Sequence, residues 1–276
     1  MSELWSRLGF LAIALVVYRI GTHIPIPGIN PEQVAALFQQ SQGTILQYFN
    51  LFSGGALERM SIFALSVVPY ISSAIVMQLF SNSVPYLQEL KKDGQAGRNK
   101  ITQYTRYGTV IFALIQSSAL TVTLQTAGLI DAGSIFSAFT AVISIVTGTM
   151  FLMWLGEQIS ERGIGNGISI IIATSIITGV PRAFGQALEQ TQQGDLNYLL
   201  LIVLAVLTLL VVAFVVFVEN AQRKITVNYA QRNQVRGMIQ APSSFLPLKL
   251  NMSGVIPAIF ASTFLLFPAS LSSWFG

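Results

Sequence analysis

The chain of 276 residues is 53% hydrophobic but only 9% charged, whereas a soluble domain carries about 25% charged residues. So few charges cannot cover a 30.0 kDa globule, and the net charge of +4 is small, which argues against a soluble enzyme and for a protein solvated by lipid. The chain has no cysteine and one histidine, His23, so we expect no disulfide, no metal or acid–base site and no cofactor.

Seven segments are apolar enough to be membrane-spanning helices, since about 20 such residues cross a hydrocarbon core about 30 Å thick. They lie at about residues 5–24, 62–80, 107–124, 135–155, 168–180, 199–218 and 255–274. The first carries Arg19, which we expect to snorkel to the headgroups. The fifth is short because we expect Pro181 to stop it. The other spans contain no charged residue.

The basic residues predict how these spans are oriented. With the N-terminus in the cytoplasm, every Lys and Arg except Arg19, Arg59 and Arg182 falls on the cytoplasmic side, as the positive-inside rule requires. The two longest cytoplasmic segments are expected to be loops, at residues 81–106 and 219–252. The first apolar stretch lacks a small-x-small cleavage site, so we do not interpret it as a signal peptide.

The outer segment, residues 22–61, is too apolar for an ordinary loop. It opens with the proline-rich turn IPIPG at residues 24–28 and closes with an apolar stretch at residues 45–60. We expect this stretch to be a short helix that cannot span the membrane. It must therefore be buried in protein or line a cavity.

The sequence bears on three kinds of chemistry: phosphate binding, proteolysis and coupled transport. Residues 163–167 read GIGNG, but no strand precedes them and no P-loop Lys follows, so a tight turn between helices is favoured over a phosphate site. Ser53 lacks a second histidine that would act as its base, which disfavours proteolysis. A coupled transporter should place charges inside its spans, and their scarcity favours a passive conduit or a scaffold.

Three pairs of aliphatic residues are spaced four apart, so each pair shares one helical face. The pairs are Val67 with Ile71, Ile168 with Ile172, and Val255 with Ile259. Pro69, within a span, and Pro257, near the start of one, are expected to bend their helices, which favours a conduit. By spacing alone, ordinary packing or lipid-facing residues remain the simpler interpretation.

Five stretches of the sequence are distinctive: IPIPG at 24–28, FSGGAL at 52–57, KITQYTRYGT at 100–109, and residues 148–169 and 246–262. Together they resemble the SecY family, the channel subunits of the bacterial protein translocon. The resemblance covers essentially the whole chain, with a shorter outer loop around residues 126–134. It implies an all-α, polytopic transmembrane bundle that contains the first five-helix half of the channel and two helices of the second half. Because family members have ten spans, we expect the chain to be a fragment.

The resemblance also implies roles for particular residues. A ring of aliphatic side chains should close an hourglass channel at its waist, formed here by Val67, Ile71, Ile168, Ile172 and Ile259. A plug at residues 45–60 should fill the outer funnel, including Phe49, Leu51, Phe52, Ser53, Gly54 and Gly55. The basic loop at 219–252 should dock a ribosome or a motor, through Arg223, Lys224, Arg232 and Arg236. Residues 62–80 and 107–124 should form one side of a lateral gate, with residues 255–274 on the other.

We therefore expect a passive protein-conducting channel and not an enzyme, acting in secretion and in lateral insertion of helices at the bacterial inner membrane. The partners that the resemblance implies are SecE and SecG, the SecA motor, the ribosome with its RNA and proteins, signal peptides and nascent chains, and membrane lipids. A different class remains as the alternative, namely a secondary transporter or permease for a small or lipid-like solute.

Overall fold

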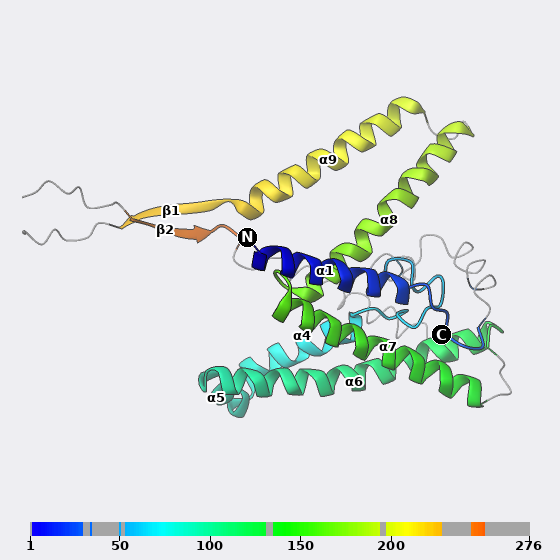
Figure 1. Cartoon of the computed structure of the whole chain (residues 1–276), viewed down its shortest axis with the longest axis horizontal. Helices are drawn as coiled ribbons and strands as arrows, with labels where there is room; N and C mark the ends of the chain where they lie inside the picture. The colour runs from blue at the N-terminus through cyan, green and yellow to red at the C-terminus, as the bar shows by residue number, and fades with distance from the viewer. Residues whose placement is uncertain are drawn as a thin grey trace, which may run out of the picture. The chain divides into compact units, whose positions relative to one another are not determined.

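The computed structural model describes residues 2–29, 34, 50, 53–130, 135–193, 197–227 and 244–251. Its elements are α1 (Ser2–Gly21), α4 (Val68–Ser83), α5 (Pro85–Lys92), α6 (Gln95–Thr126), α7 (Ile135–Arg162), α8 (Gly167–Gln192), α9 (Tyr198–Asn220), β1 (Gln222–Val227) and β2 (Ser244–Lys249) (Figure 1). The described residues up to Phe184 form one compact unit, and those from Gly185 onward form another. The expected mostly helical architecture is confirmed.

Five of the described helices, α1, α6, α7, α8 and α9, are long and apolar enough to cross a membrane. They coincide with five of the predicted spans, because an uninterrupted apolar run has few alternatives to a helix in lipid. The predicted span at 255–274 lies outside the described residues.

The predicted span at 62–80 begins later than expected. Residues 62–67 form turns, Ser66 has a left-handed backbone with φ of 51°, and α4 starts only at Val68. Pro69 therefore lies in the first turn of α4, where its missing N–H would have had no helical partner. The bend that we expected from Pro69 in mid-helix is thus wrong.

The expectation that Pro181 ends the fifth span is also wrong. Helix α8 continues to Gln192 with Pro181 inside it. A proline removes one backbone hydrogen bond, but membrane helices tolerate that loss where local adjustments satisfy the freed carbonyl. The residues that follow, AFGQALEQTQ, contain several good helix formers.

The charged segment at 81–106 is helical rather than a loop. It contains α5 and the first turns of α6, joined through Gly94, which has a φ of 69°. Leu87 and Leu90 are buried on one face of α5, while Lys91 and Lys92 are exposed. The charges that suggested a solvated loop are therefore the polar face of an amphipathic helix.

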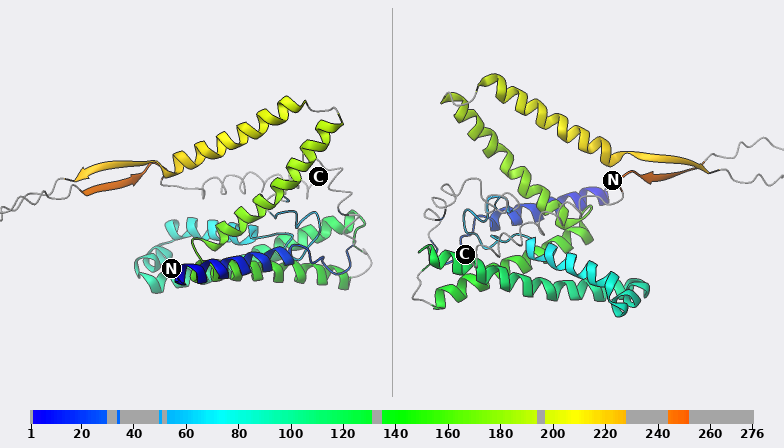
Figure 2. Two further views of the ribbon diagram at one scale, coloured as in Figure 1. Left: turned by 45° about the horizontal axis from the view of Figure 1, so that its top comes forward. Right: turned by 180° about the vertical axis from the view of Figure 1, so that it is seen from behind.

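Within the first unit, α6 packs against both α4 and α7, and α1 packs against α7 (Figures 1 and 2). The packed face of α6 repeats every four residues and is made of small side chains: Thr105, Thr109, Ala113, Ser117 and Thr121. Small side chains let helix backbones approach closely in a membrane. At this contact Ser73 donates a hydrogen bond of 2.7 Å to the carbonyl of Thr105.

Helix α7 makes an equally close approach at Gly148. A Cβ atom placed there would overlap the carbonyl oxygen of Ile62, so only glycine fits against the Ile62 backbone. Two apolar clusters form the core of this unit. One is centred on Ile26, Met60 and Ile145, and the other on Tyr18, Phe63 and Leu152.

The second unit contains α9 and a two-stranded antiparallel ribbon, which the sequence analysis did not predict (Figure 1). The strands pair from Gln222 with Lys249 to Val227 with Ser244. Pro247 is tolerated because both strands of a two-stranded sheet are edges. No residue of α9 is buried among the residues that the structure describes.

We expect the substitution Gly148→Ala to lower the free energy of unfolding by about 1–3 kcal/mol, because the added methyl group must displace the Ile62 backbone. Thermal unfolding of the purified protein in detergent measures the change. Gly9→Ala in α1 is the matched control, since a Cβ there meets no described atom within 4 Å. Equal melting temperatures for the two variants would contradict the close approach.

Candidate functional site

A non-helical segment, residues 53–67, lies inside the first unit and leads into α4. We call it the turn segment. Its middle is tied to the proline-rich turn: the Ile26 N–H donates to the Met60 carbonyl (2.8 Å), and the Ile62 N–H donates to the Ile24 carbonyl (3.0 Å). Of the short helix expected within 45–60, residues 53–60 form turns instead, Asn50 is helical, and residues 45–49 and 51–52 lie outside the described residues. Gly54 and Gly55, with φ of 65° and 81°, take left-handed conformations that interrupt a helix.

The Ser53–Gly54 turn is held from two helices, in an arrangement that we call the clasp. The Tyr18 hydroxyl of α1 lies 3.4 Å from the Ser53 carbonyl and is hydrogen-bonded to the Ser175 hydroxyl of α8. The Arg19 guanidinium reaches the Gly54 carbonyl at 3.5 Å. Tyr18 and Ser175 are both buried, so the two contacts of the Tyr18 hydroxyl are shielded from solvent.

Aromatic stacking fixes the position of the Tyr18 ring. Tyr18 and Phe63 are stacked with ring centroids 6.1 Å apart, and Phe63 stacks in turn on Phe151 of α7 at 5.9 Å. Such pairs contribute about 0.5–1.5 kcal/mol each beyond the area that they bury. The hydroxyl of Tyr18 is therefore presented to the turn by a rigid side chain.

His23 joins Arg19 and Arg59 at the end of α1. Its Nδ1 lies 2.9 Å from the Arg19 carbonyl and its Nε2 lies 3.2 Å from the Arg59 guanidinium. Because a carbonyl only accepts and a guanidinium only donates, the geometry assigns the proton to Nδ1. Arg19 thus contacts the turn segment, and its expected place at the headgroups stays a prediction.

Four of the five predicted ring residues gather in one apolar cluster. Val67, only 2% exposed, belongs to the cluster that contains Tyr18 and Phe63. Three others pack against that cluster: Ile71 on α4, and Ile168 and Ile172 on α8. Ile259 lies outside the described residues. The arrangement brings side chains from two distant parts of the sequence to one apolar junction.

The predicted plug and docking residues are described only in part. Ser53, Gly54 and Gly55 lie in the turn segment, whereas Phe49, Leu51 and Phe52 lie outside the described residues, as do Arg232 and Arg236. Arg223 and Lys224 are exposed on β1. As successive strand residues they point to opposite faces of the ribbon.

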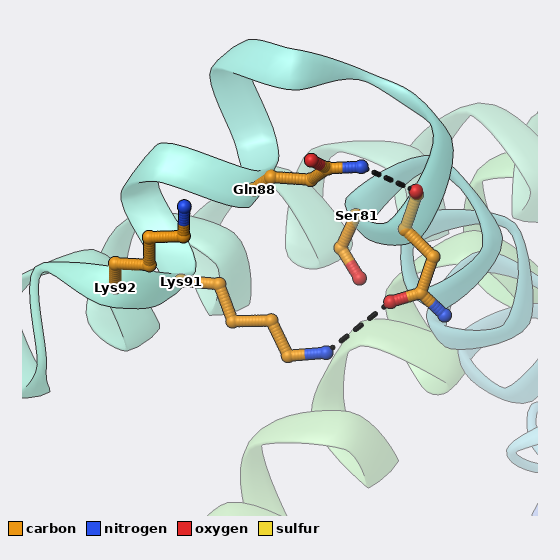
Figure 3. A pocket seen from close by; sticks show the side chains of 5 residues that line it. Ser81, Gln88, Lys91 and Lys92 are labelled. Carbon is orange, nitrogen blue, oxygen red and sulfur yellow. Dashed lines mark hydrogen bonds between the residues drawn. The ribbon is translucent and has the colours of Figure 1, made fainter.

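A shallow pocket of about 300 Å³ lies where α4 meets α5, lined by Ser81, Asn82, Gln88, Lys91 and Lys92 (Figure 3). The Gln88 amide donates to the Asn82 carbonyl, and Lys91 Nζ lies 3.3 Å from Asn82 Oδ1. These bonds close the turn between the two helices. We therefore interpret the pocket as part of the helix connection.

One ion pair joins the polar ends of α6 and α7. Arg106 makes a bidentate contact with Glu157, with both N–O distances at 2.8 Å. The paired geometry strengthens the contact, and the part-buried carboxylate limits screening by solvent. Within the part of the chain that the structure describes, no group of three His, Cys, Asp or Glu could hold a metal ion.

Tyr18 and Ser175 were not singled out from the sequence. The available signal was their polarity, since a hydroxyl group inside an apolar span needs a partner in the protein. Serine and threonine recur in these helices, however, and most of them bond to a carbonyl of their own helix, as Thr109 does to Thr105. Sequence alone did not separate Ser175 from this background.

Three kinds of comparison agree on similarity to protein translocation channels. The SecY family model matches residues 61–276. The protein translocase subunit SecY of Pseudomonas aeruginosa is 58% identical over 276 residues, and that of Escherichia coli K12 is 55% identical over 280. The whole of this chain is matched in both, but it covers only 62% and 63% of those proteins. The SecY of a Buchnera aphidicola strain is 56% identical, with 79% of its length covered.

Solved structures show the same fold at lower sequence identity. A protein-conducting channel matches 95% of this chain with a TM-score of 0.67, and a SecY structure concerned with the plug domain matches 97% with a TM-score of 0.70. Sec61 in a canine ribosome–channel complex matches 95% with a TM-score of 0.65. Each is 19% identical, and this chain covers 56–57% of each.

Proposed function

The chain belongs to the SecY family, and from that membership we propose that it forms a passive protein-conducting channel. Its task is the secretion of polypeptides across the bacterial inner membrane and the lateral insertion of helices into that membrane. Two kinds of relative support the proposal, the translocase subunits that share over half of its residues and the channel structures that share its fold.

The observation that carries the proposal is the apolar junction of Val67, Ile71, Ile168 and Ile172, at the end of the turn segment. A constriction lined by aliphatic side chains expels water and so blocks ions. It forms no specific bonds with a polypeptide, so it yields to chains of any sequence. We propose that Ile259 completes this ring.

We propose that residues 45–60 act as the plug of this channel. The dense hydrogen bonding of the Ser53–Gly54 turn supports a segment with a defined closed position. A structurally similar SecY has a plug domain that stabilises the closed state and maintains a membrane seal. The segment here would fill the outer funnel in the same manner.

We propose that energy for transport comes from partners, since the channel itself is passive. The basic segment 219–252 would dock a ribosome or SecA through Arg223, Lys224, Arg232 and Arg236, because positive charge suits both RNA and acidic protein surfaces. The ribosome complex of the similar Sec61 supports the first partner. SecE, SecG, signal peptides, nascent chains and membrane lipids complete the assembly, and the positive-inside rule places the N-terminus in the cytoplasm.

The reported relatives are translocase subunits and channels, which does not favour the alternative of a secondary transporter or permease. The channel and permease hypotheses differ in one measurable respect. A polypeptide and the plug cannot occupy the same volume, whereas rocking helices would move a small solute without displacing that segment.

We expect a cysteine at Phe52, in this cysteine-free chain, to be shielded from an external thiol reagent at rest. It should become reactive while a secretory chain is trapped in the pore, because the trapped chain displaces the plug. Labelling of membrane vesicles with and without a trapped chain measures the change. Equal labelling in both conditions would contradict the plug assignment and favour the permease alternative.

We expect Ile71→Asn or Ile259→Asn to raise ion leakage through the resting channel, because an amide wets the constriction. Conductance across a planar bilayer measures the leak. Ile111→Asn is the control for Ile71→Asn. Ile111 is exposed on α6, so this substitution makes the same chemical change outside the ring. Unchanged resting conductance in both ring variants would count against the ring.

We expect reversal of Arg232 and Arg236 to Glu to weaken ribosome or SecA binding several-fold, with the largest effect at low salt, because charge complementarity steers docking. Binding titrations at several ionic strengths measure the affinity. Arg7→Glu supplies a charge reversal outside the loop, at an exposed position of α1. If low-salt affinity were unaltered, these arginines would serve orientation alone.

A further inference from the structure

One close contact joins α4 to α6 directly beside Arg106. The carbonyl of Thr105, which precedes Arg106, accepts the hydrogen bond of 2.7 Å from Ser73 of α4. Ser73 is 1% exposed, and its hydroxyl occupies the space that a Cβ atom on Gly108 would need. Sliding of α4 along α6 would lose both contacts. Because Ile71 lies two residues before Ser73, the height of Ile71 is fixed relative to α6.

A second close contact joins α7 to α8 directly beside Glu157. The side chain of Ile168 occupies the space that a Cβ atom on Gly156 would need, and the Gly156 carbonyl occupies the space that one on Gly167 would need. The Ser160 hydroxyl bridges the two glycines, since it donates to the Gly156 carbonyl at 2.9 Å and accepts from the Gly167 N–H at 2.8 Å. The start of α8, and with it Ile168, is therefore fixed against α7.

The ion pair of Arg106 and Glu157 connects these two contacts. The guanidinium binds both carboxylate oxygens at 2.8 Å, which fixes the orientation of the two groups as well as their separation. Most exposed ion pairs contribute little, but bidentate geometry is an exception, and the Glu157 side chain is only 18% exposed. Tyr70, which precedes Ile71 on α4, lies within electrostatic range of both charges.

The proposed ring draws its described members from both pairs of helices. Val67 and Ile71 lie at the start of α4, whereas Ile168 and Ile172 lie in the first two turns of α8. An aliphatic constriction expels water only while its side chains remain close together. The spacing between the α4–α6 pair and the α7–α8 pair therefore decides whether the ring seals.

We propose that Arg106 and Glu157 are positioning residues that set the spacing between the two sides of the proposed constriction. The pair acts through Ser73 on the side of Ile71 and through Gly156 on the side of Ile168. Both charged residues act through other side chains and not by contact with the transported chain. The inference rests on the channel and the ring proposed above.

The geometry of the pair can be tested separately from its charge. Arg106→Lys keeps the positive charge that orients the span but lacks the planar fork that binds both carboxylate oxygens. Arg106→Gln and Glu157→Gln each remove the pair. Since a single interaction joins the two residues, the double variant Arg106→Gln/Glu157→Gln should change the spacing no more than either single variant does.

Spin labels at two exposed positions measure the spacing without assuming any transport. Leu79 on α4 and Ile177 on α8 are 56% and 65% exposed, and both are replaced by Cys in the intact, otherwise cysteine-free protein in lipid vesicles. We expect the distribution of distances between the labels to shift and broaden in Arg106→Gln and Glu157→Gln, and less so in Arg106→Lys. Resting ion conductance should rise about three- to tenfold in the two glutamine variants.

Arg7→Gln is the matched control, because Arg7 pairs at 2.9 Å with Glu3 of the same helix, so its loss breaks an ion pair without separating helices. Thermal unfolding of each variant checks that the fold survives, and Arg106→Lys keeps the test available if the glutamine variants unfold. Distances that match those of the parent or of Arg7→Gln would overturn the inference, as would additive effects in the double variant. If the distances change but resting conductance does not, the positioning role stands and the proposed ring fails.

Discussion

A backbone that leaves the helix inside a membrane must find every hydrogen-bond partner within the protein, and residues 53–67 place that demand on their neighbours. Ile24 and Ile26 form backbone hydrogen bonds with the middle of the segment, at Ile62 and Met60. Tyr18 and Arg19 reach the carbonyls of its turn. Helix α7 has a glycine at position 148, and the Ile62 carbonyl occupies the space that a side chain would need there. The packing of α1, α7 and α8 is organised around this one irregular stretch.

The spans were predictable because hydropathy indicates whether a segment is solvated by lipid or by water. In lipid, a long apolar segment satisfies its backbone hydrogen bonds by forming a helix. Helix ends were less predictable, because they depend on local partners. Pro69 begins a helix and Pro181 sits within one, although the same residue type was expected to bend the first and end the second. The ribbon of β1 and β2 escaped prediction because a two-stranded pairing joins segments separated by 16 residues, which carry no pattern that identifies them as partners.

Residues of the candidate site could be predicted only through the resemblance of their segments to the family. Spacing placed Val67 and Ile71 on one face but could not distinguish a constriction from ordinary packing, and the structure then brought them to the same cluster as Ile168. The clasp was beyond sequence reasoning. Tyr18 and Ser175 lie 157 positions apart, and nothing in either segment specifies the other.

Helix α4 has a consequence for how the protein is made. Its 16 residues, at about 1.5 Å each, extend about 24 Å, which is less than the hydrocarbon thickness of about 30 Å. A ribosome delivers α4 before α6, the helix whose small-residue face receives it. We expect α4 to be stable as a span only once α6 packs against it, whereas α9 is by itself long and apolar enough to cross a membrane.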